Sequence, residues 1–292
     1  MPERPKVIKT VALIGKYAIE KDEALVCEMY NYIKKRKYNV LFDESVGQLL
    51  GEEGMTKAQL MKKADLAVVL GGDGTLLKTA RSLGKRKVMV YGINLGNVGF
   101  LTESPRDKAM YGIKRVLSNK YVLDKRMMLR VTVYRNSKKI YTDLALNEAV
   151  ISQGAKARII KLRVEMNQRK VNTYMADGLI ISSPSGSTGH SLSAGGPVVH
   201  PKIAGLLITP ICPVSLTNRP IILPNDRQIN ITVETVRQEH ERVALTLDGQ
   251  QTFSLEYGDQ VKVRKSSRIL YLIRMTGENY YRALRAKLKW GD

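Results

Sequence analysis

The chain has 292 residues, 43% of them hydrophobic, and its 48 Lys and Arg against 27 Asp and Glu give a formal net charge of +21. This apolar fraction excludes a disordered chain, and the length allows one large domain or two of ordinary size. No apolar run approaches the roughly 18 residues that span a bilayer, residues 1–9 lack a signal-peptide pattern, and two cysteines cannot form a disulfide framework. We therefore expect a soluble, cytoplasmic protein whose charge favours anionic partners without identifying them.

Strands and helices alternate over the first third of the chain. Continuous apolar runs predict three buried strands, and apolar residues at helical spacing predict three helices. The strands are expected at residues 11–14, 64–70 and 88–93, and the helices at residues 22–35, 75–83 and 106–117. Such an alternation is typical of a parallel sheet covered on both faces, so this part predicts an α/β domain.

Strands dominate from residue 129 onward. A hairpin is expected first, with strands at 129–134 and 140–146 around the turn 135–137. Further strands are expected at residues 159–166, 179–182, 228–235, 243–247, 260–264 and 269–273. This spacing predicts a second, sandwich-like β domain, and a helical pattern over 279–290 closes the chain.

A glycine-rich segment, Gly71-Gly72-Asp73-Gly74-Thr75, directly follows a predicted strand and precedes a predicted helix. We call it the GGDGT loop. Glycines let the backbone approach a ligand closely, and a helix N-terminus after a parallel strand suits a phosphate. The loop is neither the dinucleotide fingerprint, which would need glycine at Leu77, nor a P-loop. The alternative is a tight turn in which Asp73 only caps the helix.

Two later segments are also rich in polar groups. Asn147 and Glu148 lie in a strand pattern, which would place them on opposite faces, and the inward one needs partners from a ligand or a loop backbone. Residues 176–197 combine Asp177 with many serines, a threonine and glycines, which suits a polar or sugar-bearing ligand. The alternative for this run is a polar loop followed by a capped helix. It contains no serine nucleophile elbow, and the three histidines are not at zinc-ligand spacing.

The three segments together resemble the bacterial NAD kinases. Their order and spacing agree with that family, as do residues 92–101 and 209–220, and the resemblance extends from residue 11 to residue 290. The hydroxyl-rich run is its most specific part. Related forms of the GGDGT loop occur in diacylglycerol kinases, sphingosine kinases and 6-phosphofructokinases.

The resemblance implies that ATP phosphorylates the 2′-hydroxyl of the adenosine ribose of NAD, giving NADP. It implies an α/β domain with a parallel sheet at residues 1–124, to which the helix at 275–292 returns. It implies a β-sandwich-like NAD-binding domain at residues 125–274, and a site formed by both domains. It also implies Mg²⁺ or another divalent ion, held mainly through the ATP phosphates, and a homodimer or homotetramer with shared sites. The choice between NAD and NADH, ATP and polyphosphate, dimer and tetramer, and the presence of feedback regulation stay open.

The resemblance also assigns roles to individual residues. Asp73 matches the proposed general base, since phosphoryl transfer depends mainly on positioning and charge neutralisation. Residues expected to contact the ATP phosphates are Gly71, Gly72, Gly74, Thr75 and Lys78. Residues expected to contact NAD are Asp73, Gly74, Asn147, Glu148, Arg158, Asp177, Thr188, Gly189, His190, Ser191, Leu192, Ser193 and Gln250.

Some features depart from the family or allow another function. His190 replaces a tyrosine, and because imidazole is smaller and can become charged, we expect weaker and pH-dependent NAD binding. Met175 stands where some relatives carry arginine. A lipid kinase of the same superfamily is an alternative, although the Asn147-Glu148 pair and the hydroxyl-rich run argue against it. A nucleic-acid-binding protein is a second alternative, but it depends on net charge alone, since the basic residues are scattered and no stacking set or docking motif is present.

Overall fold

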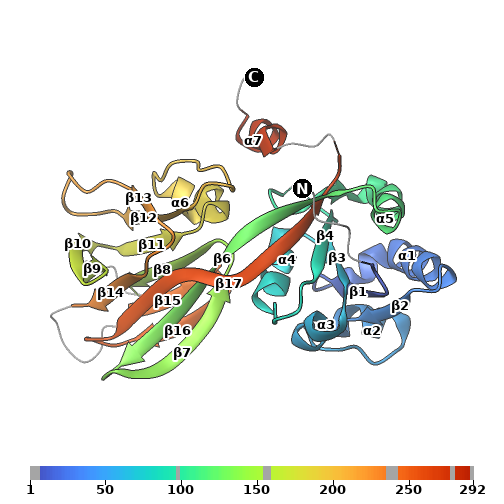
Figure 1. The fold of residues 1–292 in the computed structure, drawn as a ribbon, viewed down its shortest axis with the longest axis horizontal. Helices are drawn as coiled ribbons and strands as arrows, with labels where there is room; N and C mark the ends of the chain where they lie inside the picture. The colour runs from blue at the N-terminus through green and yellow to red at the C-terminus, as the bar shows by residue number, and fades with distance from the viewer. Residues whose placement is uncertain (1–6, 97–98, 154–158, 235–242, 277–279, 290–292) are drawn as a thin grey trace. The chain divides into compact units, whose positions relative to one another are not determined.

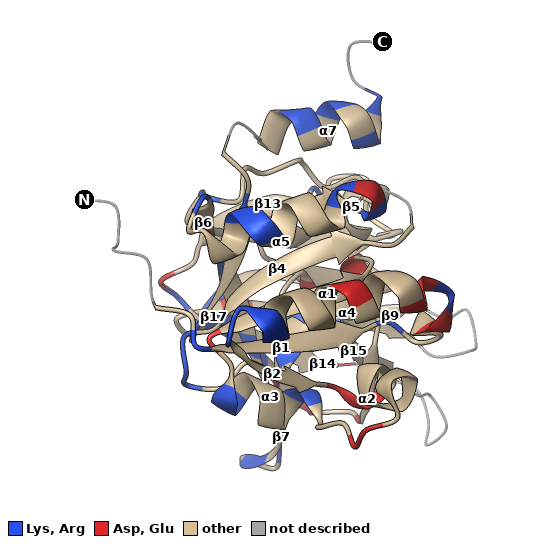
Figure 2. Ribbon diagram, turned by 90° about the vertical axis from the view of Figure 1, so that its right-hand side faces the viewer, with Lys and Arg blue, Asp and Glu red and all other residues tan. Residues whose placement is uncertain are grey.

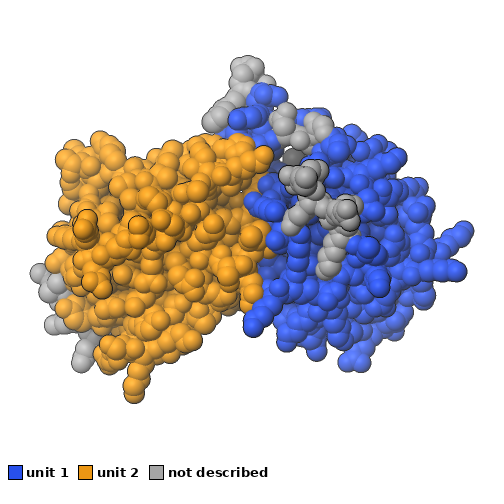
Figure 3. All heavy atoms as spheres, in the orientation of Figure 1, with its two compact units in different colours: residues 1–125, 270–292 blue, residues 126–269 orange. Residues whose placement is uncertain are grey.

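The computed structural model describes residues 7–96, 99–153, 159–234, 243–276 and 280–289. The chain forms two compact units, coloured separately in Figure 3. Unit 1 comprises Met1–Lys125 and Leu270–Asp292, and unit 2 comprises Arg126–Ile269. The chain passes from one unit to the other within two long strands, β6 (Val122–Arg135) and β17 (Gln260–Arg274).

Unit 1 is an α/β unit built on a parallel sheet (Figure 1). The strand order is β2-β1-β3-β4, and the end of β17 and the short strand β5 also pair with β4 in parallel. The strands are β1 Thr10–Gly15, β2 Asn39–Phe42, β3 Leu66–Gly71, β4 Met89–Asn94 and β5 Ser104–Pro105. The helices are α1 Glu23–Lys35, α2 Glu44–Leu50, α3 Lys57–Lys63, α4 Asp73–Arg81, α5 Ala109–Leu117 and α7 Tyr280–Leu288, with 3-10 turns η1 Ile19–Asp22 and η2 Arg106–Lys108.

Strands β3 and β4 are buried along their whole length because helices cover the sheet. One core cluster joins alternate residues of β3, such as Leu66 and Val68, to Met29 of α1 and Ile113 of α5. Helix α4 packs on β3 and β4. The β3–β4 register sets Gly71 opposite Asn94, so the GGDGT loop lies at the carboxyl edge of this sheet.

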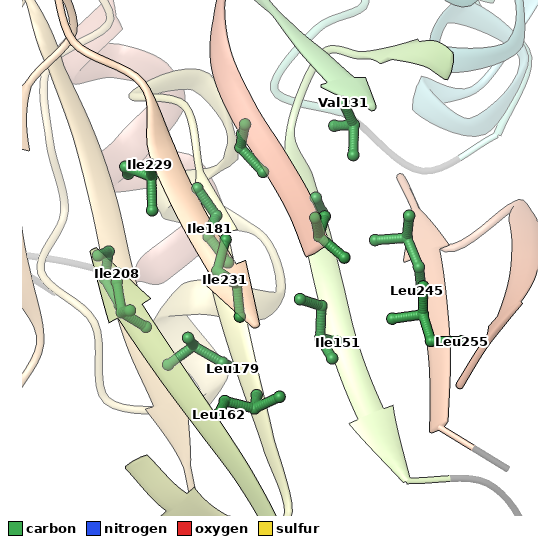
Figure 4. Close-up of a cluster of buried hydrophobic side chains, with 14 of the residues drawn as sticks. Val131, Ile151, Leu162, Leu179, Ile181, Ile208, Ile229, Ile231, Leu245 and Leu255 are labelled. Carbon is green, nitrogen blue, oxygen red and sulfur yellow. The ribbon is translucent and has the colours of Figure 1, made fainter. Parts of the chain in front are cut away.

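Unit 2 is a sandwich of two sheets whose strands have the orders β7-β6-β17-β14-β9-β10 and β13-β12-β11-β8-β15-β16. Their apolar side chains meet in one cluster that includes Leu162, Ile181, Ile208 and Ile231 (Figure 4). The remaining strands are β7 Lys138–Ala145, β8 Glu148–Gln153, β9 Ile160–Met166, β10 Arg169–Ala176, β11 Gly178–Ser182, β12 Gly205–Ile211, β13 Ile221–Pro224, β14 Ile229–Val233, β15 Val243–Leu247 and β16 Gln251–Leu255. Two short helical segments, η3 Ser185–Thr188 and α6 His190–Ser193, follow β11.

The predicted fold class is confirmed, with an α/β part first and a β-rich part after it. Some local expectations differ from the structure. The strands expected at residues 260–264 and 269–273 form the single strand β17. The helix expected from residue 22 begins at Glu23, and Asp22 ends the turn η1 before it; the Asp22 carboxylate forms ion pairs with Lys16 at 2.9 Å and with Arg106 at 2.8 Å.

Basic residues are spread over separate elements (Figure 2). Helices α1, α3, α5 and α7 each carry two of them in the last turn, where the helix dipole favours positive charge. The described helices include none long and apolar enough to cross a membrane.

Candidate active site

The GGDGT loop connects β3 to α4. Gly72 occupies the N-cap position in an extended conformation, and Asp73 is the first residue of the helix. Gly71 must be small, because a Cβ there would collide with the hydroxyl of Thr75. Lys78 lies one turn into α4 and is exposed. The loop therefore presents a helix N-terminus at the sheet edge, an arrangement that favours a phosphate.

The Asp73 carboxylate is held by the segment that follows β4. Its Oδ2 accepts a hydrogen bond from the Phe100 amide at 2.8 Å. Its Oδ1 accepts three, from the Leu101 amide at 3.2 Å and from the amide and hydroxyl of Thr102 at 3.1 and 3.3 Å. A carboxylate oxygen has two lone pairs, so with respect to the described residues Oδ2 is the oxygen with room to accept a hydrogen bond from a ligand. Asp73 thus does not act as a helix cap.

Gly99 lets this segment approach the carboxylate. A Cβ at Gly99 would overlap the carboxylate oxygens of Asp73. We call residues 99–102 the clamp of Asp73. These residues were not among the predicted site residues, although a Gly-Phe pair shortly after the neighbouring parallel strand is a signal in the sequence.

In unit 2, Asn147 and Glu148 lie closer together than the strand pattern predicted. Asn147 is in the bend between β7 and β8, and only Glu148 belongs to β8. Both side chains lie beside Gly189, where a Cβ would be 3.3 Å from Oε2 of Glu148 and 3.7 Å from Nδ2 of Asn147. The expectation that they point to opposite faces is therefore wrong, because the bend rotates Asn147 out of the strand alternation.

Asp248 fixes the backbone of this bend. Its buried carboxylate accepts hydrogen bonds from the amides of Leu146, Asn147 and Glu148 at 2.9, 2.8 and 3.1 Å. Asp248 and Gly249 have φ of 50° and 64°, as in the tight hairpin turns that Asp-Gly favours. Asp248 was not among the predicted site residues, although the Asp-Gly pair between two strand patterns marks such a turn.

Buried acceptor atoms gather at this bend. Within the described residues, Oδ1 of Asn147 and Oε2 of Glu148 are buried and have no hydrogen-bond partner. Leaving a buried polar atom unpaired typically costs about 1–3 kcal/mol, so these atoms favour a ligand that carries donors. Burial, together with the nearby charge of Asp248, raises the pKa of Glu148 to about 8. Gln250, on the same turn as Asp248, adds a further buried amide oxygen. We call Asn147, Glu148 and Gln250 the acceptor cluster.

The hydroxyl-rich run is used largely to build its own loop. The hydroxyls of Ser183 and Ser182 donate to the carbonyls of Leu146 and Asn147 at 2.5 and 3.2 Å. The buried Ser191 pairs with Thr209 at 2.9 Å. Of the other predicted residues in the run, Thr188, Gly189 and Leu192 are partly buried, whereas His190 and Ser193 are exposed.

The structure does not bring every predicted residue to the acceptor cluster. In the pairing of β11 with β8, Ser182 lies opposite Glu148 whereas Gly178 lies opposite Ser152. Asp177 precedes Gly178 at the other end of β11, so it lies roughly 16 Å from Ser182 along a strand that rises about 3.3 Å per residue. Arg158 lies outside the described residues.

Family models match both units. The model of the ATP-NAD kinase N-terminal domain matches residues 11–121, and that of the ATP-NAD kinase C-terminal domain matches residues 146–275. The chain belongs to the ATP-NAD kinase family. As a member of this family it is an enzyme that uses ATP to phosphorylate NAD, and the family match favours this reading over the lipid-kinase alternative.

Similar proteins support the assignment over the full length. The NAD kinases of Geotalea daltonii and Geobacter metallireducens are each 41% identical to the chain, over 286 and 285 residues, covering 98% of this chain and 100% of theirs. A crystal structure of yeast NADH kinase complexed with NADH has a TM-score of 0.89 at 24% identity, covering 98% of this chain and 89% of that one. An NAD kinase from Archaeoglobus fulgidus in complex with ATP has a TM-score of 0.74 at 24% identity, covering 96% and 98%. The two structures establish that the fold is shared.

Proposed function

We propose that the chain phosphorylates the 2′-hydroxyl of the adenosine ribose of NAD, and that Oδ2 of Asp73 accepts the proton of that hydroxyl. The observation that carries this proposal is the geometry of the carboxylate: among the described residues, Oδ1 accepts three hydrogen bonds while Oδ2 accepts one. The clamp fixes the carboxylate without using the remaining lone pair of Oδ2. A fixed acceptor of this kind orients a hydroxyl nucleophile, which is the main task of the protein in phosphoryl transfer.

The acceptor cluster is our proposed site for the adenosine half of NAD. The adenine amino group and the ribose hydroxyls are donors, as the buried oxygens of Asn147 and Glu148 require. With its pKa near 8, the carboxyl of Glu148 is mostly protonated at neutral pH, so it can both donate and accept. A sugar hydroxyl does the same and is therefore a matched partner. Thr188, Gly189, His190, Leu192 and Ser193 are proposed to line the same ligand, with Ser191 holding the run in place.

The ATP phosphates are proposed to bind at the GGDGT loop, along Gly71, Gly72, Gly74 and Thr75, with Lys78 as a nearby cation. A divalent ion such as Mg²⁺ fits this site chiefly through the phosphates, because Oδ1 of Asp73 is already occupied by three donors. When bound with ATP, the ion offsets phosphate charge. The protein itself contributes by placing the helix N-terminus and the Asp73 carboxylate beside the reacting groups.

We also propose a homodimer or homotetramer with shared sites. Asp177 is separated from the acceptor cluster along β11, and it lies two residues from Met175, an exposed apolar side chain. Val214, whose amide donates to the Met175 carbonyl at 2.9 Å, and Leu216 are exposed as well. A second copy that covers these apolar residues would lie beside Asp177, and we propose that Asp177 contacts the dinucleotide of that copy.

We propose that the two domains bind different substrates. Residues 1–124, with the helix at 275–292, would handle ATP and the reacting carboxylate, and residues 125–274 would bind NAD. We propose the cytoplasm as the location, since both substrates are coenzymes of the cell interior.

The proposal is tested by the position of the new phosphate. The purified chain is incubated with ATP, Mg²⁺ and NAD, and the product is measured with a dehydrogenase that requires the 2′-phosphate of NADP. We expect a signal that depends on all three components. ATP consumption with a phosphorylated dinucleotide that this dehydrogenase rejects would contradict transfer to the 2′-hydroxyl. Parallel reactions with NADH or with polyphosphate determine acceptor and donor preference.

A further inference from the structure

One largely buried arginine holds the side of the clamp that faces away from Asp73. Arg274, the last residue of β17, has a side chain that is only 17% exposed. Its Nη2 donates to the carbonyl of Phe100 at 3.0 Å, and its Nη1 donates to Oε2 of Glu103 at 2.9 Å. Asp124 lies 3.5 Å from its Nε. All these residues belong to unit 1.

The carbonyl that Arg274 binds belongs to the same peptide group as the Leu101 amide. That amide donates to Oδ1 of Asp73 at 3.2 Å. A peptide group is planar, so fixing its carbonyl also fixes the direction of its N–H. The guanidinium charge also polarises the group, which strengthens the hydrogen bond from its N–H. Arg274 is thus linked to the Asp73 carboxylate through a single peptide group.

Glu103 keeps Arg274 in this position. Its side chain is 4% exposed, and its second oxygen accepts the amide of Met275 at 2.6 Å. The Glu103 amide in turn donates to the carbonyl of Gly92 in β4 at 2.8 Å. The end of β17 and the clamp are therefore joined to each other and to the sheet.

We infer that Arg274 is a positioning residue for the phosphoryl transfer: acting through the Phe100–Leu101 peptide, it holds the Asp73 carboxylate in the orientation that accepts the ribose hydroxyl. The inference rests on the proposed role of Asp73. Glu103 supports it by fixing the guanidinium. Neither residue touches the reacting atoms, so their effect is on the rate of the chemical step more than on substrate binding.

The test compares Arg274→Met and Arg274→Lys with Arg115→Met. Arg115 is a matched control, because it also holds the segment after β17 by donating to the Thr276 hydroxyl at 2.7 Å. Its hydrogen bonds within the described residues go to Tyr111 and Thr276 and not to the clamp. We expect Arg274→Met to lower kcat between about 10- and 100-fold, the range that small misplacements cause, with both KM values within about twofold of wild type. Lysine restores part of kcat, since it carries the charge but cannot hold two acceptors as a planar fork does. Arg115→Met keeps the wild-type kcat.

The Asp73→Asn variant tests whether Arg274 acts through Asp73. In Asp73→Asn, adding Arg274→Met should change the residual rate less than about twofold, because asparagine at this position no longer accepts the proton, so its orientation does not affect the rate. The same fold loss in both backgrounds would overturn the inference, and so would a wild-type kcat in folded Arg274→Met or Arg274→Lys. Equal losses of kcat and Tm in Arg274→Met and Arg115→Met would also overturn it, since they indicate a general loss of structure. Near-normal turnover of Asp73→Asn alone would instead refute the proposed function.

Discussion

Replacing Glu148 with glutamine should remove a pH-dependent penalty on folding. Burial and the nearby charge of Asp248 raise the pKa of Glu148 from its ordinary value of 4.5 to about 8. Between these two values the folded protein holds a proton that the unfolded chain has released. The free energy of unfolding of the ligand-free protein therefore falls as pH rises from about 4.5 to about 8, and this contribution levels off above that.

The size of the effect follows from the two pKa values. Each tenfold change in proton affinity corresponds to about 1.4 kcal/mol, so ionising Glu148 in the fold costs at most about 5 kcal/mol. That is a large part of the roughly 5–15 kcal/mol by which a native protein is stable. Glutamine keeps the shape of the side chain but cannot ionise, so Glu148→Gln should gain stability relative to wild type as pH rises.

Urea unfolding between pH 5 and pH 9 in the absence of nucleotides measures this directly. The difference between Glu148→Gln and wild type should grow with pH across the window and stop growing above about pH 8. Glu53→Gln, which changes an exposed carboxylate, serves as the control and should follow the wild-type profile. Parallel profiles for Glu148→Gln and wild type would refute the reasoning, because they would mean that Glu148 ionises as readily in the fold as in the unfolded chain.

Two further predictions concern the clamp and the assembly. Gly99→Ala should lower kcat by about 100-fold, because the new methyl group displaces the Asp73 carboxylate. Gly96→Ala is the control and should keep the wild-type kcat, because a Cβ there would lie 4.0 Å from its nearest neighbour. Equal kcat values for the two variants would contradict the proposed role of the clamp. If Asp177 serves the neighbouring subunit, mixed oligomers of Asp73→Asn and Asp177→Asn should regain activity in a coupled NADP assay, because one site of each mixed pair then has both aspartates. Activity that stays at the level of the separate variants would contradict a shared site.

The fold class was predictable because its signals are local. The apolar run before the GGDGT loop is long enough for a strand buried on both faces, and β3 is buried throughout. The turn after residue 134 has Asn136 and Ser137 at positive φ, as a short hairpin loop requires. Strand β17 was predicted as two pieces because the polar residues 265–268 interrupt its apolar alternation, although backbone hydrogen bonding continues the strand there.

The partners of the candidate site residues were not predictable in the same way. The GGDGT loop is a local pattern, but the amides that hold Asp73 come from residues 27 to 29 positions later in the chain. Arg274 lies 174 positions from the carbonyl it binds, and Asp248 lies 100 positions from the Glu148 amide. Such pairs are created by the order of strands in the sheets, which periodicity does not encode. Only the Asp-Gly turn and the Gly-Phe pair give a local hint of them.

The central claim is that the carboxylate of Asp73 acts on the ribose hydroxyl, and Asp73→Asn tests it most directly when turnover and NAD binding are measured on the same preparation. Asparagine can keep the three hydrogen bonds to Oδ1 through its amide oxygen, but its amide nitrogen neither accepts the Phe100 bond nor takes up a proton. We predict that kcat falls by at least about 100-fold, as expected for loss of a general base, while the calorimetric Kd for NAD and the Tm stay close to wild type. Near-normal NADP formation by folded Asp73→Asn would contradict the account.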